Sequence, residues 1–321
     1  MTKGSDPFVL VAPDSFKGTF TAVEVAAAIG RGVVRAGVAA DLCPVADGGE
    51  GTMEVLLGAL GGQLETARAH DPLGREIEAS FAVLDDGRAV VETAAASGLA
   101  LLSEDELDPW NASTRGTGEL IVAAGDREVL VAVGGSATMD GGAGALAAIA
   151  GRSVRLRVLS DVETPWERCA EIYGPQKGAD AAMVERLRAR FDEQAAALPR
   201  DLRGVAMTGA AGGLSGGLWA ALGAELHAGA RFVLDAIGFD DRLDDADAVI
   251  VGEGRLDEQS AMGKIVGEIA ARAERAGVPV HAVVGSSRIG AADAERLALR
   301  SVTEASTLPE LEDAGYRIAR G

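Results

Sequence analysis

The segment of residues 134–142 reads GGSATMDGG, and its residue types suit the binding of an anion. Glycines such as Gly135 let the backbone approach a phosphate or a carboxylate closely. The hydroxyls of Ser136 and Thr138 can donate hydrogen bonds to the oxygens of such a ligand. Asp140 can accept a proton from a substrate or bind Mg²⁺. The alternative is a glycine-rich turn in which Asp140 is the N-cap of the next helix.

The flanking residues predict the elements that hold this segment. Residues 129–133 are apolar and rich in valine, which is typical of a strand buried on both faces. Residues 143–150 are small and compatible with a helix. A strand, a loop and a helix in this order direct backbone N–H groups and a helix N-terminus at one point, which favours an anion there.

Further polar tracts follow strand-like runs elsewhere in the chain. Phosphoryl transfer needs cations around the phosphates, a carboxylate that accepts a proton, and Mg²⁺. The carboxylates in these tracts are Asp14, Asp47, Asp140, Asp161, Glu253 and Asp257. The cations are Lys17, Arg115, Lys177, Arg255 and Lys264, and the hydroxyls include Ser15, Ser113 and Thr114. The chain has no GxxxxGK[ST] sequence, which excludes a P-loop kinase.

Two kinds of cation stand out in these tracts. Arg115, beside two hydroxyls and two glycines, can bind a carboxylate or phosphate with two parallel hydrogen bonds; the alternative is a surface ion pair with Glu119. The chain has only four lysines, and Lys17, Lys177 and Lys264 all lie in glycine-bearing motifs. A compact ammonium enters a narrow site that a planar guanidinium cannot, so we expect these lysines to contact phosphate or carboxylate groups.

Composition excludes several classes of function. The 321 residues carry a net charge of −19, which argues against partners such as nucleic acids or anionic membrane surfaces. Two distant cysteines and three scattered histidines predict neither a disulfide framework nor a zinc site. The N-terminal residues do not resemble a signal peptide and no segment has transmembrane length, so we expect a cytoplasmic protein that acts on small molecules, with homo-oligomers left open.

Strand and helix patterns alternate at both ends of the chain, whereas the middle differs. Strands are expected at 8–12, 40–45, 248–251 and 278–284, with helices at 21–36 and 52–60. Residues 63–93 alternate apolar with polar side chains around a hairpin signal, which indicates antiparallel strands. The predicted fold class is α/β: a doubly wound Rossmann-like domain of residues 1–60 plus 240–321, and an inserted second α/β domain of residues 61–239 with antiparallel strands and Gly-rich loops.

Nine motifs occur in a fixed order between Val9 and Gly285. They read APDSFKG, ADGGEGT, DPLGR, ASGL, STRGTGE, GGSATMDGGAG, GPQKGA, GAAGGL and GEGRLDEQ. In this order they resemble the type I glycerate kinase family. The chain departs from the family pattern at Met139, where the family usually has Asn, and at residues 162–173, where the family has a longer, glycine-rich loop.

The resemblance implies ATP-dependent phosphorylation of a hydroxyl of D-glycerate, most simply the 2-hydroxyl to give 2-phosphoglycerate, in a cleft between two domains with Mg²⁺. We expect catalytic roles for Asp14, Lys17, Asp47, Asp140 and Asp161. Substrate or phosphate binding is expected of Ser15, Ser113, Thr114, Arg115, Gly135, Ser136, Thr138, Lys177, Glu253, Arg255, Asp257 and Lys264. The expected metal ligands are Asp47, Asp161 and Asp257.

Two other functions stay open from the sequence. Because segment 162–173 departs from the family pattern, one alternative is a non-catalytic homologue that binds sugar acids. Gly142-x-Gly144-x-x-Ala147 fits a loose dinucleotide fingerprint of an oxidoreductase, although the loop before it is too long for the tight turn that such a site needs.

Overall fold

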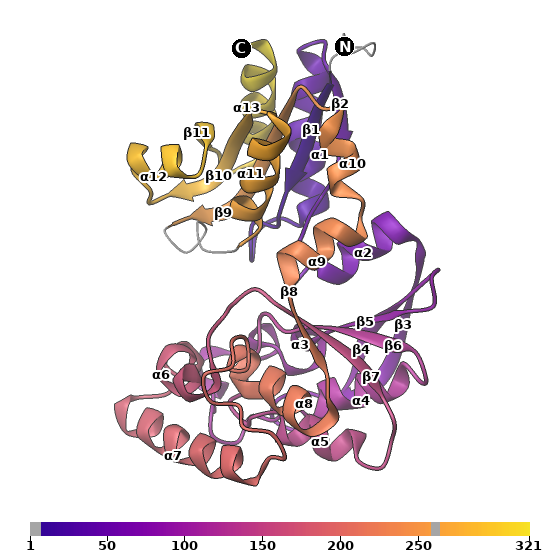
Figure 1. Ribbon diagram of the computed structural model, residues 1–321, viewed down its shortest axis with the longest axis vertical. Helices are drawn as coiled ribbons and strands as arrows, with labels where there is room; N and C mark the ends of the chain where they lie inside the picture. Colours follow the sequence, from indigo (N-terminus) through magenta and orange to yellow (C-terminus); the bar gives the residue numbers. More distant parts are fainter. Residues whose placement is uncertain (1–7, 258–263) are drawn as a thin grey trace. The chain divides into compact units, whose positions relative to one another are not determined.

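The computed structural model describes residues 8–257 and 264–321, and the chain divides into two compact units (Figure 1). The first unit contains Met1–Asp47 and Ala230–Gly321, and the second contains Gly48–Gly229. The second unit is thus inserted into the first.

The observed boundaries of the units differ from those expected at 60/61 and 239/240. Helix α2 (Thr52–Leu60) belongs to the second unit, because Met53 N–H donates to the Glu92 carboxylate at 2.8 Å beside that unit's sheet. Helix α9 (Gly229–Ala236) joins the first unit from Ala230 onwards, since Ala230 and Leu234 pack in that unit's core.

The sheet of the first unit is parallel throughout and has the strand order β11-β10-β9-β1-β2. Its strands are β1 (Phe8–Pro13), β2 (Ala39–Leu42), β9 (Ala248–Leu256), β10 (Val280–Ser287) and β11 (Leu299–Glu304). Parallel neighbours require crossover connections, and helices supply them here.

Helices cover both faces of this sheet, as expected for a doubly wound fold (Figure 1). Helices α1 (Ala22–Arg35) and α13 (Leu308–Arg320) pack side by side on one face, around Val11 and Ile250. Helices α9, α10 (Phe239–Asp244) and α11 (Ile265–Ala276) cover the other face, around Leu10 and Val249. Helix α12 (Ala291–Arg296) connects β10 to β11.

The second unit has a mixed sheet of order β3-β4-β5-β6-β7-β8, antiparallel from β3 to β5 and parallel from β5 to β8. Its strands are β3 (Gly62–His70), β4 (Glu76–Leu84), β5 (Ala89–Glu92), β6 (Glu128–Ala132), β7 (Arg155–Ser160) and β8 (Glu225–Ala228). Its other α-helices are α3 (Thr93–Ser97), α4 (Arg115–Ala123), α5 (Ala143–Ile149), α6 (Cys169–Tyr173), α7 (Ala181–Ala197) and α8 (Leu214–Leu222). Short 3₁₀ helices lie at Leu99–Leu101, Glu104–Glu106, Trp166–Arg168, Pro175–Lys177 and Ala210–Gly213.

One strand is longer than its sequence indicates. The apolar run predicts a strand at 248–251, followed by a loop GEGRLDEQ, yet β9 continues to Leu256. The cause is pairing with β10, which extends along β9 as far as Ser287 opposite Leu256. Glu253 and Arg255 are therefore strand residues, and residues 258–259 of the motif lie outside the described part of the chain.

Within residues 8–257 and 264–321, the helices are all too short or too polar to span a lipid bilayer.

Candidate functional site

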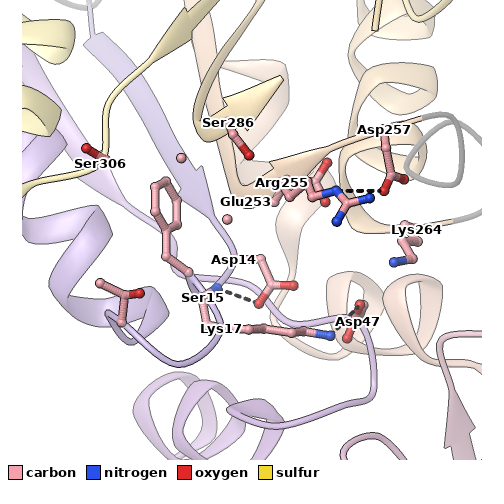
Figure 2. A pocket seen from close by; sticks show the side chains of 14 residues that line it. Asp14, Ser15, Lys17, Asp47, Glu253, Arg255, Asp257, Lys264, Ser286 and Ser306 are labelled. Atoms are coloured by element: carbon pink, nitrogen blue, oxygen red, sulfur yellow. Dashed lines mark hydrogen bonds and ion pairs between the residues drawn. The ribbon is translucent and has the colours of Figure 1, made fainter. Parts of the chain in front are cut away.

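A pocket of about 530 Å³ lies in the first unit, at the carboxyl ends of β1 and β9 (Figure 2). The chain leaves β1 toward β2 on one side, and leaves β9 toward β10 on the other. The two ends therefore flank a topological switch point, where open α/β sheets bind ligands. The predicted site residues that line this pocket are Asp14, Ser15, Lys17, Asp47, Glu253, Arg255, Asp257 and Lys264.

Like Asp47, Asp14 is deeply buried in this pocket, with 4% of its surface exposed. Its own N–H donates to the carbonyl of Gly252 at 2.8 Å, which fixes the end of β1 against β9. Its carboxylate accepts the N–H of Ser15 at 2.6 Å. Burial raises the pKa of Asp14 well above its usual value, and the charge of Asp47 raises it further. A carboxylate with a raised pKa is suited to accept a proton in general base catalysis.

Asp47 and Lys17 bring opposite charges to the same pocket. The Lys17 ammonium lies 3.9 Å from a carboxylate oxygen of Asp47, and the side chain of Lys17 is 53% exposed whereas that of Asp47 is 5% exposed. The Lys17 side chain extends past Asp14 toward Asp47 (Figure 2). An exposed ammonium at the mouth of a buried acidic site can contact a phosphate without losing its water at the outset.

Arg255, Asp257 and Lys264 form the opposite side of the pocket. Arg255 Nε lies 3.3 Å from the Asp257 carboxylate, and Lys264 is the N-cap residue of α11. Ser286, at the end of β10, and Ser306, after β11, also line the pocket. Neither serine is among the residues predicted from the sequence, although their position at the ends of parallel strands is the signal that identifies the others.

The acidic residues of this pocket fit Mg²⁺ only as a partner of phosphates. Within the described residues, no group of three or more His, Cys, Asp or Glu side chains is placed to hold a metal ion alone. Mg²⁺ is usually bound by one or two carboxylates together with substrate phosphates and water. Asp47 and Asp257 share this pocket, whereas Asp161, the third predicted ligand, lines a pocket of the second unit.

In the second unit, the contacts of Asp140 are those of a structural residue. Its carboxylate accepts hydrogen bonds from the N–H and O–H of Thr114, both at 2.9 Å, and from the N–H groups of Gly142 and Gly144 at 3.0 and 3.1 Å. Thr114 in turn accepts the N–H of Ala145 at 3.0 Å. These bonds hold the loop before α5 and reach the N–H of Gly144 in its first turn, but the N-cap residue of α5 is Gly142 and not Asp140. A catalytic role for Asp140 stays a prediction.

Arg115 forms the ion pair that was the alternative to an anion clamp. Its Nε lies 2.8 Å from Glu119, which also accepts a hydrogen bond from the N–H of His70. Arg115 and Ser113 nonetheless line a second-unit pocket of about 560 Å³ together with Arg68. Binding of a carboxylate or phosphate by Arg115 stays a prediction.

Lys177 lies in a separate, smaller pocket of the second unit. Only 2% of its surface is exposed, and its ammonium donates to Ser136 Oγ and to the carbonyl of Thr138, both at 2.8 Å. Gly135 and Asp161 line the same pocket. Burial lowers the pKa of Lys177 to about 8, although Cys169 and Asp140 act in the opposite direction.

The two departures from the family pattern meet in one hydrophobic core. Met139 is fully buried and packs in the same cluster as Trp166, which lies in the altered segment 162–173. The Trp166 ring meets the Phe191 ring edge to face at 4.9 Å, and its indole N–H donates to the Phe191 carbonyl. An Asn at 139 would be buried among apolar groups here, so the two changes are physically consistent with each other.

Comparison with known proteins decides the family. Residues 9–155 and 149–315 match the glycerate kinase family. The chain belongs to this family. It is 39% identical to a glycerate kinase from Bacillus subtilis and 37% identical to a glycerate 2-kinase from Escherichia coli, in each case over 87% of this chain and 85% of the relative.

A solved structure from Salmonella typhimurium LT2, described as a candidate glycerate kinase 2, has the same fold. It superposes with a TM-score of 0.82 at 32% identity and covers 98% of both chains. The family assignment makes the protein an enzyme of the kinase class and confirms both the resemblance and the α/β fold.

Proposed function

We propose that this glycerate kinase family member transfers the γ-phosphoryl group of ATP to the 2-hydroxyl of D-glycerate. The observation that carries the proposal is the first-unit pocket, where three cations and four carboxylates meet at the switch point of a parallel sheet. Such a pocket has the components that phosphoryl transfer needs, namely cations for the phosphates and a buried carboxylate for the proton.

Each charged group has a part in this reaction. Lys17, Arg255 and Lys264 bind the phosphate oxygens of ATP and stabilise the charge that moves onto the leaving ADP. Asp14 accepts the proton of the glycerate hydroxyl while the new O–P bond forms and the bond to ADP breaks.

The buried carboxylates also suit a metal. Asp47 and Asp257 would hold Mg²⁺ that arrives with the nucleotide, and the ion would neutralise charge on the phosphates. The expectation that both substrates meet in a cleft between the two units stays a prediction.

The direct test is a reaction of the protein with ATP, Mg²⁺ and D-glycerate. ADP formation measures the transfer, and ³¹P NMR of the product identifies the hydroxyl. Phosphorus on carbon 2 couples to one proton and gives a doublet, whereas phosphorus on carbon 3 couples to two and gives a triplet. A triplet would refute the 2-hydroxyl, and binding of glycerate without ADP formation would refute the kinase.

Variants of two carboxylates in the same unit test the pocket. Asp14→Asn should lower kcat by about 100-fold or more, in the range typical of lost general base catalysis. Asp244, at the end of α10, is exposed and does not line the pocket, so Asp244→Asn should leave kcat within twofold. Equal activity in both variants would show that the chemistry does not use this pocket.

A further inference from the structure

The Lys177 pocket in the second unit has a volume of about 100 Å³, which is too small for a nucleotide. Its lining includes Gly134, Gly135, Ser136, Asp161, Tyr173 and Lys177. These residues come from the loop after β6, the end of β7, and the segment of α6 and the following 3₁₀ helix.

The Lys177 ammonium is buried beside neutral acceptors. Both of its hydrogen bonds go to uncharged oxygens, those of Ser136 and Thr138. Within residues 8–257 and 264–321, the Lys177 ammonium forms no ion pair with a carboxylate, and its hydrogen bonds go to Ser136 and Thr138 alone. An ammonium has three N–H groups, so one more acceptor is needed. A buried positive charge without a counter-ion is costly, which points to an anionic ligand.

The charged and titratable groups around the ammonium do not supply that counter-ion. The Asp140 carboxylate already accepts four hydrogen bonds, two of them from Thr114. Burial raises the pKa of the Cys169 thiol to about 12, and burial also raises the pKa of Tyr173 to about 12, so both groups are neutral at physiological pH. Asp161 lines the pocket and makes its surroundings more negative.

We propose that this pocket binds the carboxylate of a small organic acid, with Lys177 and Ser136 as donors. Ser136 accepts a bond from Lys177 through its oxygen, so its own O–H is available to donate. The negative charge of Asp161 in the pocket lining disfavours a second charge on the ligand, so a monoanion is favoured over a phosphate dianion. The identity of the acid as D-glycerate rests on the proposed function; the anion site itself does not.

Calorimetric titration of the full chain with D-glycerate, without nucleotide, tests the proposal. Lys177→Met keeps the length of the side chain and removes the charge, and it should weaken glycerate binding at least tenfold. Arg168→Met removes a charge from an exposed position in the same unit and should leave binding within twofold. Glycerol, which has the hydroxyls but no carboxylate, should not bind. Equal glycerate affinity in Lys177→Met, or tighter Lys177-dependent binding of inorganic phosphate, would overturn the proposal.

A measurement on the unaltered protein covers the case in which the variant does not fold. At pH 8, binding of a carboxylate should complete the protonation of Lys177, so titrations in buffers of different ionisation enthalpy should show proton uptake. A crystal structure of the unaltered protein in which glycerate lies away from Lys177 would overturn the pocket assignment.

The two proposals fail separately. Lys177-dependent glycerate binding without ADP formation would refute the kinase and support the pocket. ADP formation together with normal glycerate affinity in Lys177→Met would support the kinase and refute the pocket.

Discussion

The carboxylate of Asp140 accepts both the backbone N–H and the side-chain O–H of Thr114, each at 2.9 Å. The two residues lie 26 positions apart, and the contact joins the start of α4 to the start of α5. Asp140 is thus the connection between two glycine-bearing loops that the sequence presents as separate motifs.

Replacement of Asp140 should lower the stability of the protein more than it lowers the rate of the catalysed reaction. Asp140→Ala leaves the Thr114 hydroxyl and three N–H groups without their acceptor, and each unsatisfied buried group costs about 1–3 kcal/mol. We expect the free energy of unfolding of Asp140→Ala to fall by roughly 2–4 kcal/mol or more, and that of Asp140→Asn to fall by less. Urea denaturation measures both. An inactive Asp140→Asn variant of unchanged stability would contradict this and restore the catalytic interpretation.

Replacement of pocket lysines by arginine should lower activity without lowering stability in the first unit. Lys17→Arg and Lys264→Arg keep the charge, but a planar guanidinium does not match a site shaped for an ammonium. We expect kcat/KM to fall about tenfold, equivalent to about 1.4 kcal/mol of transition-state binding, with little change in Tm.

The same change at Lys177 should behave differently. That side chain is 2% exposed, so the larger guanidinium should also reduce stability, by about 1–3 kcal/mol. Near-normal kinetics in all three lysine-to-arginine variants, at positions 17, 177 and 264, would mean that arginines such as Arg115 and Arg255 bind the anions.

The stability of the protein should depend on pH through Lys177. Burial lowers the pKa of Lys177 to about 8, whereas its usual value is 10.5. Between these pH values the unfolded chain binds more protons at this position than the folded chain, so the contribution of Lys177 to stability rises with pH and is flat below about pH 8. The Tm of Lys177→Met minus that of the parent should therefore decrease from about pH 7.5 to about pH 10. The thiols of Cys43 and Cys169 titrate in both proteins and cancel, and a constant difference would show that the folded-state pKa is normal.

Metal binding should depend on the nucleotide. Because the described residues hold no cluster of three ligands, Mg²⁺ alone should bind weakly, with a Kd of about 1 mM or above, and ADP should tighten it. Asp47→Asn should remove most of this gain in calorimetric titrations. Excess chelator should abolish ADP formation until Mg²⁺ or Mn²⁺ is added back; full turnover in chelator would refute the metal requirement.

Substitution by alanine should have opposite effects on stability at two glycines. A Cβ at Gly32 would overlap the carbonyl of Glu312, because α1 and α13 pack at backbone distance, so Gly32→Ala should lower Tm. Gly58 lies on the exposed face of α2 with nothing within 4 Å, so Gly58→Ala should raise stability by about 0.4–1 kcal/mol. Thermal unfolding of the two variants checks both signs.

Local patterns explain the parts of the fold that the sequence predicts. The Thr21 and Glu24 spacing predicts a capping box, and the structure has both of its hydrogen bonds, at 3.2 and 2.9 Å. The motifs after β1 and β9 converge because adjacent parallel strands bring their carboxyl ends to one edge of a sheet. These relationships need no knowledge of distant contacts.

The role of Asp140 and the grouping of the aspartates needed the tertiary structure. A structural carboxylate and a catalytic one have the same sequence signature, and the hydrogen bonds of Asp140 to Thr114 become visible only in the tertiary structure. Asp161 follows a strand, as Asp14 does, but its strand belongs to the second sheet. The partnership of Met139 with Trp166 is likewise a packing result that no local pattern contains.

The insertion of one unit into the other sets the order in which the chain can fold during synthesis. Strand β1 pairs with β9, whose first paired residue is Ala248, whereas the whole second unit is one continuous segment. Domains fold as they leave the ribosome, N-terminal parts first, so here the second unit has all of its strands available before the first unit does. Until β9 is made, β1 has an unpaired edge, and such edges are templates for aggregation. A nascent chain that stops between residues 229 and 248 therefore contains all of the second unit together with a strand, β1, that lacks its partner β9.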